Sequence, residues 1–196
     1  MILLELFCGT KSISKEAEKQ GIETITLDYD KKHNPTICED ILKWNYKEYF
    51  KNRDKPDIIW ASPDCRTFSI ARHHHRTKDN IMGITNDAKL ANKMIQRTIQ
   101  IIKYLKPKHW FIENPRGRLR YLPIMKKFKR VTIYYSNYNH YCHKPTDIWT
   151  NTSFLKDEKM KKIKLTSFSL IGSGKDRRLR YKMPEQLCEH IISNVH

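Results

Sequence analysis

A cysteine and a glutamate each lie at the end of a short apolar segment of this sequence. Cys65 follows the run from Asp57 to Pro63, which reads as a buried strand that stops at a proline. Glu113 lies in a second such run, from His109 to Pro115. Unpaired cysteines are most often small buried hydrophobic residues, but chemistry in open α/β sheets takes place just beyond the carboxyl ends of the strands. We therefore expect Cys65 to act as a nucleophile and Glu113 to exchange a proton beside it.

The amino-terminal segment predicts the elements of a nucleotide-binding half-fold. Apolar runs and turn residues indicate a strand, a tight turn, a helix and a second strand, over residues 2–7, 8–12, 13–20 and 22–27. Ser12 or Ser14 is expected to cap the helix, and Gly21 to end it. Asp28 then lies where a carboxylate hydrogen-bonds ribose hydroxyls in such folds.

The tight turn contains one glycine, Gly9, and has Lys11 where phosphate-binding turns usually have a second. A pyrophosphate would lack close backbone contact there, whereas a nucleoside ligand without phosphates would not need it. S-adenosylmethionine is such a ligand, and Asp40 and Ile41 could hold its adenine ring. A βαβ turn with no ligand, and a solvated acid at Asp40, are the simpler alternatives.

The remaining apolar segments complete an α/β domain. The longest predicted helix runs from Asp87 to Leu105, and further strands are expected over residues 131–135 and 144–151. The stripe of the long helix indicates core packing and comprises Leu90, Met94, Thr98, Ile101, Ile102 and Leu105. Pro184 opens a closing helix, 184–195, whose apolar side comprises Leu187, Cys188, Ile191, Ile192 and Val195. We expect a single domain over residues 1–196, with 152–175 a short recognition or linker segment.

The chain is strongly basic, with 38 Lys and Arg residues, 21 Asp and Glu residues and a formal net charge of +17. Such a surplus attracts polyanions, so nucleic acid is the first candidate partner, and a lysine-rich composition with no partner is the alternative. A basic loop from Arg66 to Lys78, with Arg72, His74 and Arg76, follows Cys65 and suggests contact with a phosphate backbone, unless it is simply a solvated charged loop. Tyrosines near basic residues could stack on bases or be half-buried strand residues: Tyr134, Tyr135, Tyr138 and Tyr141.

Cysteine spacing and hydropathy bear on where the chain works. Its 5 cysteines have no C-x-x-C spacing, which favours free thiols in a reducing compartment and a cytoplasmic location. No metal site is expected, because neither His140 with Cys142 and His143 nor the run His73 to His75 has suitable ligand geometry. No segment approaches the ~20 apolar residues that cross a bilayer, so we expect no membrane contact. No feature of the sequence indicates an obligate protein partner.

Together, the two strand ends would suit chemistry on a pyrimidine base. Carbon C5 of cytosine is a poor nucleophile until a thiolate adds to C6, and a carboxyl group near N3 would support that addition. Arg66, next to the thiol, is expected to favour the thiolate form of Cys65. The target base would have to leave the double helix to reach such a site.

These residues resemble the motifs of the cytosine-C5 DNA methyltransferases, and the chain is most similar to the short, phage-type members. Leu4 to Thr10 looks like the first motif of the family, Asp28 like its ribose-binding acid and Asp40-Ile41 like its adenine-contacting pair. Cys65 matches the nucleophile of the Pro-Cys motif, and Glu113-Asn114 matches the Glu-Asn pair that grips cytosine. Similarity continues through residues 144–151 and 180–191, so it covers nearly the whole chain.

The resemblance implies a Rossmann-like, S-adenosylmethionine-dependent methyltransferase fold of the α/β class, with a mostly parallel sheet and helices on both faces. It implies S-adenosyl-L-methionine as the cofactor, bound by Phe7, Gly9, Thr10, Asp28, Tyr29, Asp40, Ile41 and Pro63. It also implies DNA as the partner, contacted by Asn114, Arg66, Arg72, His74, Arg116 and Lys144. For a phage-type member the expected location is the cytoplasm of the host cell.

Three departures from the family pattern bear on activity. Asp64 precedes the nucleophile where the family usually has proline, and its carboxylate would oppose ionisation of the thiol. Lys11 replaces the second glycine of the first motif, and the arginine-rich eighth motif is reduced to Lys144-Pro145-Thr146. The chain also has no room for a large target-recognition domain. We therefore expect a short or relaxed recognition sequence, or help from a partner.

The sequence thus supports the hypothesis of a DNA (cytosine-5)-methyltransferase. One alternative is an RNA cytosine-C5 methyltransferase with the same chemistry. Another is a catalytically inactive nucleic-acid-binding module of the same fold. The amino-methylating enzymes rank lower, because Cys65-Arg66 does not supply the Pro-Pro-aromatic loop that they carry at this strand end.

Overall fold

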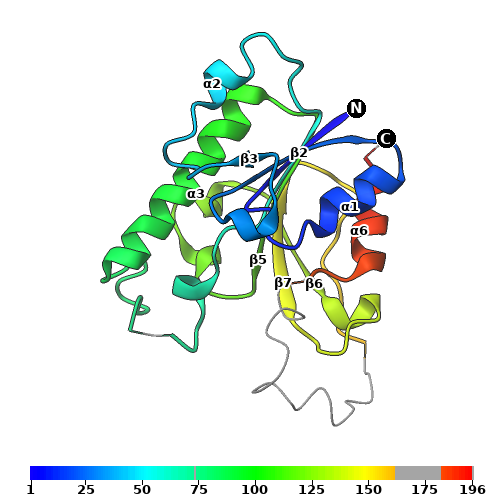
Figure 1. Cartoon of the computed structure of the whole chain (residues 1–196). Helices are drawn as coiled ribbons and strands as arrows, with labels where there is room; N and C mark the ends of the chain where they lie inside the picture. The colour runs from blue at the N-terminus through cyan, green and yellow to red at the C-terminus, as the bar shows by residue number, and fades with distance from the viewer. Residues whose placement is uncertain (73, 162–181, 196) are drawn as a thin grey trace.

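The computed structural model describes residues 1–72, 74–161 and 182–195, which form a seven-stranded sheet with helices on both faces (Figure 1). The strands lie in the order β3-β2-β1-β4-β5-β7-β6. Their bounds are Ile2–Leu6 (β1), Glu23–Asp28 (β2), Ile37–Cys38 (β3), Ile58–Ala61 (β4), His109–Pro115 (β5), Arg130–Tyr134 (β6) and Pro145–Thr150 (β7). Strand β7 runs antiparallel to both of its neighbours, and the other neighbouring pairs are parallel. The mostly parallel sheet predicted from the sequence is confirmed.

The two faces of the sheet have separate hydrophobic cores. Helices α1 (Ser12–Lys19) and α6 (Glu185–Ile192) cover one face, and α2 (Tyr46–Tyr49) and α3 (Asn86–Leu105) cover the other (Figure 1). Side chains alternate along β1, so Leu3 packs in the core beneath α1 and α6 while Leu4 packs in the core beneath α3. The strand is therefore buried on both faces, as its continuous apolar sequence predicted.

The amino terminus of α1 has no serine cap, so the prediction of Ser12 or Ser14 in that role is wrong. Lys11 occupies the cap position with a left-handed φ of 55° and makes no side-chain cap hydrogen bond. Instead, Glu5 on β1 accepts hydrogen bonds from the backbone N–H of Ser14 at 3.1 Å and from its hydroxyl at 2.5 Å. A carboxylate from a neighbouring strand thus satisfies the helix terminus.

The long helix α3 begins at Asn86 and ends at Leu105, within one residue of the prediction. Its predicted apolar stripe is buried at Thr98, Ile101, Ile102 and Leu105 and half-buried at Met94. Leu90 is an exception to the predicted buried stripe, because its side chain is 44% exposed. Near the start of the helix the buried side is formed by smaller neighbours, Ala88, Ala91 and Asn92, and Leu90 lies outside that arc.

The closing helix is confirmed by α6, whose apolar residues are buried together with Val195 in the core shared with α1. The segment 152–175, predicted as a recognition or linker segment, lies outside the described residues from position 162 onwards. Within the described ranges, no helix is both long enough and apolar enough to cross a membrane.

Candidate active site

The carboxyl ends of β4 and β5 lie side by side at one edge of the sheet. Ala61 pairs with Ile112 at the last paired position of the two strands. Just beyond it, the side-chain amide of Asn114 donates a hydrogen bond of 2.8 Å to the backbone carbonyl of Pro63. Asn114 is fully buried. This contact fixes the segment that carries Cys65 against the strand that carries Glu113.

The Cys65 thiol lies partly exposed where β4 gives way to the short turn η2 (Arg66–Phe68). The backbone carbonyl of Cys65 accepts hydrogen bonds from the N–H groups of Phe68 and Ser69 at 3.0 and 3.1 Å, which holds the turn closed. Burial raises the pKa of the Cys65 thiol, and the negative charges of Glu113 and Asp64 raise it further, whereas Lys144 lowers it. Glu113 and Lys144 therefore both lie near enough to Cys65 for their charges to act on its thiol.

Arg66 does not serve the thiol in the way predicted from the sequence. Its guanidinium pairs with the neighbouring carboxylate of Asp64, with contacts of 2.6 and 2.7 Å. The cation that lowers the pKa of Cys65 is instead Lys144, which is distant in sequence. The predicted effect of Asp64 is confirmed, because its charge raises the pKa of the thiol.

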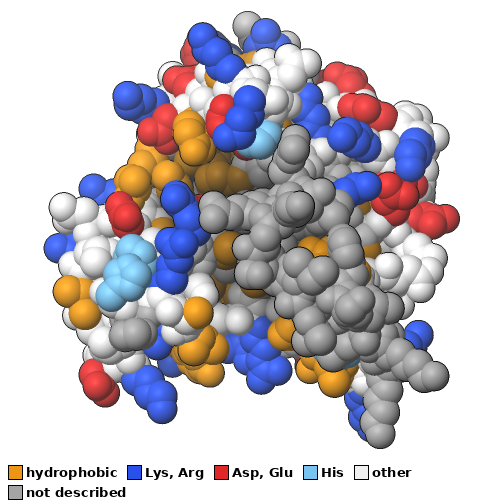
Figure 2. Space-filling model, turned by 60° about the horizontal axis from the view of Figure 1, so that its bottom comes forward, with side chains coloured by type: hydrophobic (Ala, Val, Ile, Leu, Met, Phe, Trp, Pro, Cys, Tyr) orange, Lys and Arg blue, Asp and Glu red, His pale blue; other side chains and the backbone are white. Residues whose placement is uncertain are grey.

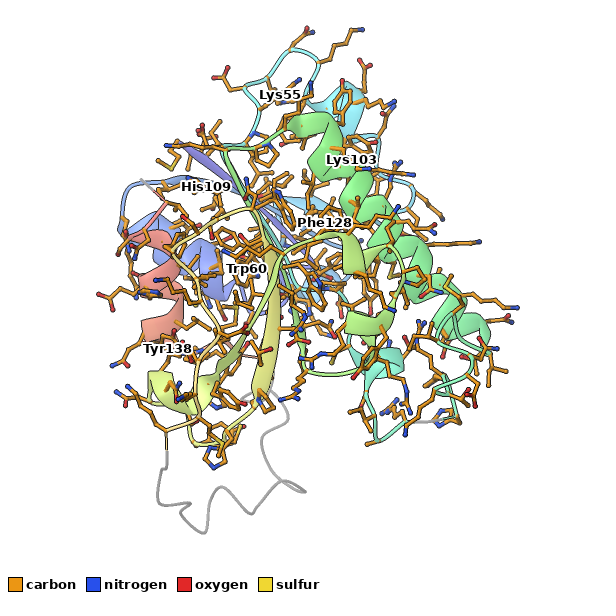
Figure 3. The ribbon with its side chains drawn as sticks, turned by 180° about the vertical axis from the view of Figure 1, so that it is seen from behind. Lys55, Trp60, Lys103, His109, Phe128 and Tyr138 are labelled. Carbon is orange, nitrogen blue, oxygen red and sulfur yellow. The ribbon has the colours of Figure 1, made fainter. Side chains whose placement is uncertain are left out.

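Glu113 is almost completely buried and is held by a tyrosine. The hydroxyl of Tyr135 donates a hydrogen bond of 3.2 Å to Glu113 Oε1. The ammonium group of Lys144 lies 4.4 Å from the centre of the Tyr135 ring. In Figure 3, His109 at the start of β5 lies well above Tyr138, which is part of the turn η5 (Tyr135–Tyr138). The turn η5 therefore lies at the end of the sheet where β5 finishes.

Tyr135 is a residue whose role the sequence did not reveal. The sequence leaves open whether this tyrosine stacks on a base or is a half-buried strand residue, whereas in the structure its side chain is fully buried and its hydroxyl donates to Glu113. The two residues are 22 positions apart and lie on elements separated by another strand, so no local spacing could have paired them.

The loop after β1 turns sharply at the same edge of the sheet. Phe7, Gly9 and Lys11 all have left-handed backbone, with φ of 58°, 46° and 55°. The N–H of Gly9 donates to Asp28 Oδ2 at 3.0 Å, and the N–H of Asp30 donates to Asp28 Oδ1 at 3.0 Å. Lys11 thus adopts the conformation that the missing glycine would take easily, and its ammonium group donates to the carbonyl of Asn34.

The other predicted cofactor residues lie along the neighbouring strand ends. Tyr29, directly after β2, is 74% exposed. Asp40 accepts a hydrogen bond from the N–H of Leu42 at 2.9 Å, and Ile41 is buried in the core on the α3 face. Pro63 is buried beside Asn114, and Thr10 is half-buried with its hydroxyl 2.9 Å from that of Ser12.

The basic loop after Cys65 contains both exposed and buried residues. Arg72 and His74 in this loop are exposed, as is Arg116 after β5, whereas His75 is buried. Arg76 is fully buried, and its guanidinium donates to three backbone carbonyls, of Thr67, Ile81 and Ala88. Arg76 therefore holds the loop together and is not available to a phosphate, contrary to the prediction for the loop as a whole. Figure 2 shows Lys and Arg side chains spread over this end of the molecule, with hydrophobic side chains visible in a hollow between them.

Comparison with known sequences gives one family. The sequence profile described as C-5 cytosine-specific DNA methylase matches residues 1–136. A protein of Frog virus 3 (isolate Goorha), named "Probable DNA (cytosine-5)-methyltransferase", is 32% identical over 158 residues, which span 77% of this chain and 71% of the viral protein.

Solved structures with the same fold are also methyltransferases. A prophage-encoded protein of E. coli, described as a DNA modification methyltransferase, aligns with a TM-score of 0.57 at 18% identity over 76% of this chain and 46% of its own. The Dnmt2 methyltransferase of S. pombe aligns with a TM-score of 0.51 at 13% identity, over 81% of this chain and 53% of its own. The methyltransferase EhMeth of Entamoeba histolytica aligns with a TM-score of 0.51 at 15% identity, over 82% of this chain and 57% of its own. The present chain spans about half the length of these proteins, and the similarity confirms the predicted Rossmann-like methyltransferase fold.

Proposed function

Since this chain belongs to the family of C-5 cytosine-specific DNA methylases, we propose that it methylates C5 of cytosine in DNA, with Cys65 as the nucleophile, Glu113 as the partner of N3 and S-adenosyl-L-methionine as the methyl donor. We further propose that residues 1–196 act as one catalytic domain. The observation that carries the proposal is the placement of the thiol and the carboxyl group at adjacent strand ends, tied together by Asn114 and Pro63.

The chemistry follows from the two side chains. The Cys65 thiolate would form a bond from Sγ to C6 of the base, and the displaced electron pair would move into the ring toward N3. Glu113 would share a proton with N3 as negative charge develops there. C5 then becomes nucleophilic and can take a methyl group. Transfer of the C5 proton to a water molecule, with cleavage of the bond from C6 to Sγ and departure of the thiolate, would restore the double bond.

The thiol needs help to ionise, because burial, Glu113 and Asp64 all raise its pKa. Lys144 opposes these effects, because its positive charge lowers the pKa of the thiol. Protonation of Glu113 on binding the base would also relieve the repulsion between the two groups. Thiolate formation and proton transfer to the base are therefore expected to be coupled.

The residues at the ends of β1, β2 and β3 fit the proposed cofactor. S-adenosylmethionine would supply an electrophilic methyl group on a sulfonium centre. The Asp28 oxygens each accept one backbone N–H and retain lone pairs for ribose hydroxyls. The exposed ring of Tyr29 offers a flat surface for adenine, with Asp40 and Ile41 on the next strand end. The space beside Gly9 is open, since a Cβ there would lie 3.9 Å from its nearest neighbour, the carbonyl of Phe7.

The expected DNA contacts come from the exposed cations around the thiol. Arg72, His74 and Arg116 would contact phosphates, and Lys144 lies close enough to Cys65 to face the extruded base. Arg66 is paired with Asp64, so contact of its guanidinium with a phosphate would compete with that ion pair. Asn114 is fully buried, so its contribution would be to hold the Pro63 carbonyl and the thiol-bearing turn in place.

Transfer of a tritiated methyl group from S-adenosylmethionine to DNA and, in parallel, to RNA tests the proposal. We expect transfer to DNA by the wild type and none by Cys65→Ser, with the cofactor still bound in calorimetric titration. Cys38→Ser, which removes an exposed thiol, is the control for loss of a cysteine. Transfer to RNA alone would favour RNA methylation, and full activity of Cys65→Ser would rule out the proposed nucleophile. If the wild type showed neither methyl transfer nor cofactor binding, the remaining interpretation would be a nucleic-acid-binding module of the same fold.

A further inference from the structure

We propose that Tyr135 is a positioning residue for Glu113, holding one carboxyl oxygen so that the other faces N3 of the base; this inference rests on the proposed function. The hydroxyl of Tyr135 lies 3.2 Å from Glu113 Oε1. Among the described residues, this is the one hydrogen bond of the Glu113 side chain, and its Oε2 atom has no hydrogen-bond partner. A carboxyl group held at one oxygen has a defined rotamer and offers the second oxygen to a ligand.

The sheet topology places Tyr135 where it can do this. Strand β7 lies between β6 and β5, and Tyr135 begins the turn that follows β6. Tyr134 pairs with Pro145 on β7, and Glu113 pairs with Ile148 on the opposite edge of β7. The Tyr135 side chain therefore reaches across β7, through the core beneath α6, to the last part of β5.

The phenol of Tyr135 remains a hydrogen-bond donor at any physiological pH. Burial and the negative charge of Glu113 raise the pKa of Tyr135 well above its usual value. The proton thus stays on the phenol, and the tyrosine acts by orientation without transferring a proton.

The same ring also orients the cation of the site. Lys144 Nζ lies 4.4 Å from the centre of the Tyr135 ring, and the charge of Lys144 lowers the pKa of Cys65. Lys144 directly precedes β7 and has a left-handed backbone with φ of 27°. Tyr135 therefore contacts both the acid and the cation that act on the thiol.

The arrangement also accounts for a departure from the family pattern. The sequence has Lys144-Pro145-Thr146 where an arginine-rich motif is expected, and Thr146 is fully buried beside the Tyr135 phenol. In the described part of the chain no guanidinium contacts Glu113. A neutral phenol thus supplies the donor to the carboxyl group, and among the described residues Lys144 is a cation that acts on the thiol.

Tyr135→Phe tests this inference, because it removes the hydroxyl and keeps the ring beneath Lys144. Tyr138→Phe is the matched control, since Tyr138 lies in the same turn and its hydroxyl donates to Glu158 and not to Glu113. We expect kcat for methyl transfer to DNA to fall about tenfold to hundredfold in Tyr135→Phe, with little change in KM or cofactor affinity. Tyr138→Phe should keep kcat within about twofold of the wild type. All comparisons use a temperature at which circular dichroism shows every variant folded.

A double-mutant cycle separates positioning from a general structural effect. If Tyr135 acts through Glu113, adding Tyr135→Phe to Glu113→Gln should slow single-turnover transfer by less than about twofold. Equal kcat in wild type and Tyr135→Phe, or full additivity of the two changes, would overturn the inference and leave the proposed function intact. Absence of transfer by the wild type would overturn the proposed function, and this inference with it.

Discussion

The side-chain amide of Asn114 donates a 2.8 Å hydrogen bond to the backbone carbonyl of Pro63, two residues before the thiol of Cys65. This contact joins the ends of two neighbouring parallel strands. Because the positions of a nucleophile and its acid partner must be held to a fraction of an ångström, such a connection matters for rate more than for binding.

Asn114→Ala should therefore lower both stability and turnover. Loss of the buried hydrogen bond is expected to reduce the free energy of unfolding by about 1–3 kcal/mol, and the loosened strand end to reduce kcat by about tenfold or more. Asn92→Ala is a matched control, since Asn92 is also buried and donates a 2.7 Å hydrogen bond to a backbone carbonyl, that of Met82. Urea unfolding and methyl-transfer kinetics of both variants provide the measurement. A similar fall in kcat for the two would contradict a specific role for Asn114.

The left-handed backbone of Lys11 leads to a prediction about stability. Lys11→Gly should raise the free energy of unfolding by about 1 kcal/mol, because glycine adopts a positive φ without a Cβ clash, and the melting temperature by about 2–4 °C. Lys11→Ala removes the same contact with Asn34 but keeps a Cβ at φ 55°, so it should show no gain. Differential scanning calorimetry of the two variants distinguishes backbone strain from loss of the side chain. A gain of equal size in both would argue against strain.

Glu5 makes stability depend on pH. Burial raises the pKa of Glu5 from 4.5 to about 7. The folded state therefore favours the protonated acid, so the contribution of Glu5 is complete below pH 4.5 and is lost as the pH rises through about 7. The loss in free energy of unfolding is about 3 kcal/mol at most.

Glu5→Gln should remove this part of the pH dependence, because the amide stays neutral and its oxygen can still accept from Ser14. Urea unfolding of wild type and variant between pH 5 and 8 checks it, with the exposed Glu48→Gln as the control for charge. The variant should gain stability relative to wild type with rising pH. Parallel curves would show that Glu5 does not titrate in this range.

Asp64 is expected to slow ionisation of the thiol. Asp64→Asn removes a negative charge that raises the pKa of Cys65, so the thiolate should form at lower pH. The rate of Cys65 alkylation by iodoacetamide near pH 8 should rise about twofold to tenfold, as followed by mass spectrometry of the peptide that contains Cys65. Asp79→Asn, at an exposed position of the same basic loop, should leave the rate unchanged. A slower reaction in Asp64→Asn would reverse the assigned electrostatic effect.

Local pattern predicted most of what positions the site. The apolar runs that end at Pro63 and Pro115 marked β4 and β5, and parallel strand ends meet at one edge of a sheet, so Cys65 and Glu113 could be placed together. The helix period likewise located α3 and α6 within a few residues.

Side-chain partners could not be predicted in the same way. Glu5, which lies on β1, takes the place of a serine cap at the start of α1, and Tyr135 reaches Glu113 across β7. Arg76, in the basic loop after Cys65, is buried because the carbonyls of Thr67, Ile81 and Ala88 accept hydrogen bonds from it. Each of these contacts depends on packing between separate elements, whereas sequence spacing reports only on neighbours within one element.

The proposed mechanism requires that Cys65 form a covalent bond to C6 of an extruded cytosine. DNA containing 5-fluorocytosine tests this bond directly, because fluorine at C5 replaces the proton whose loss would release the enzyme. We predict that, with S-adenosylmethionine present, the protein accumulates as a covalent complex, and that mass spectrometry after digestion finds the modified base on the peptide containing Cys65. Methyl transfer to ordinary DNA without any such complex, or attachment to a different cysteine, would show that Cys65 is not the nucleophile.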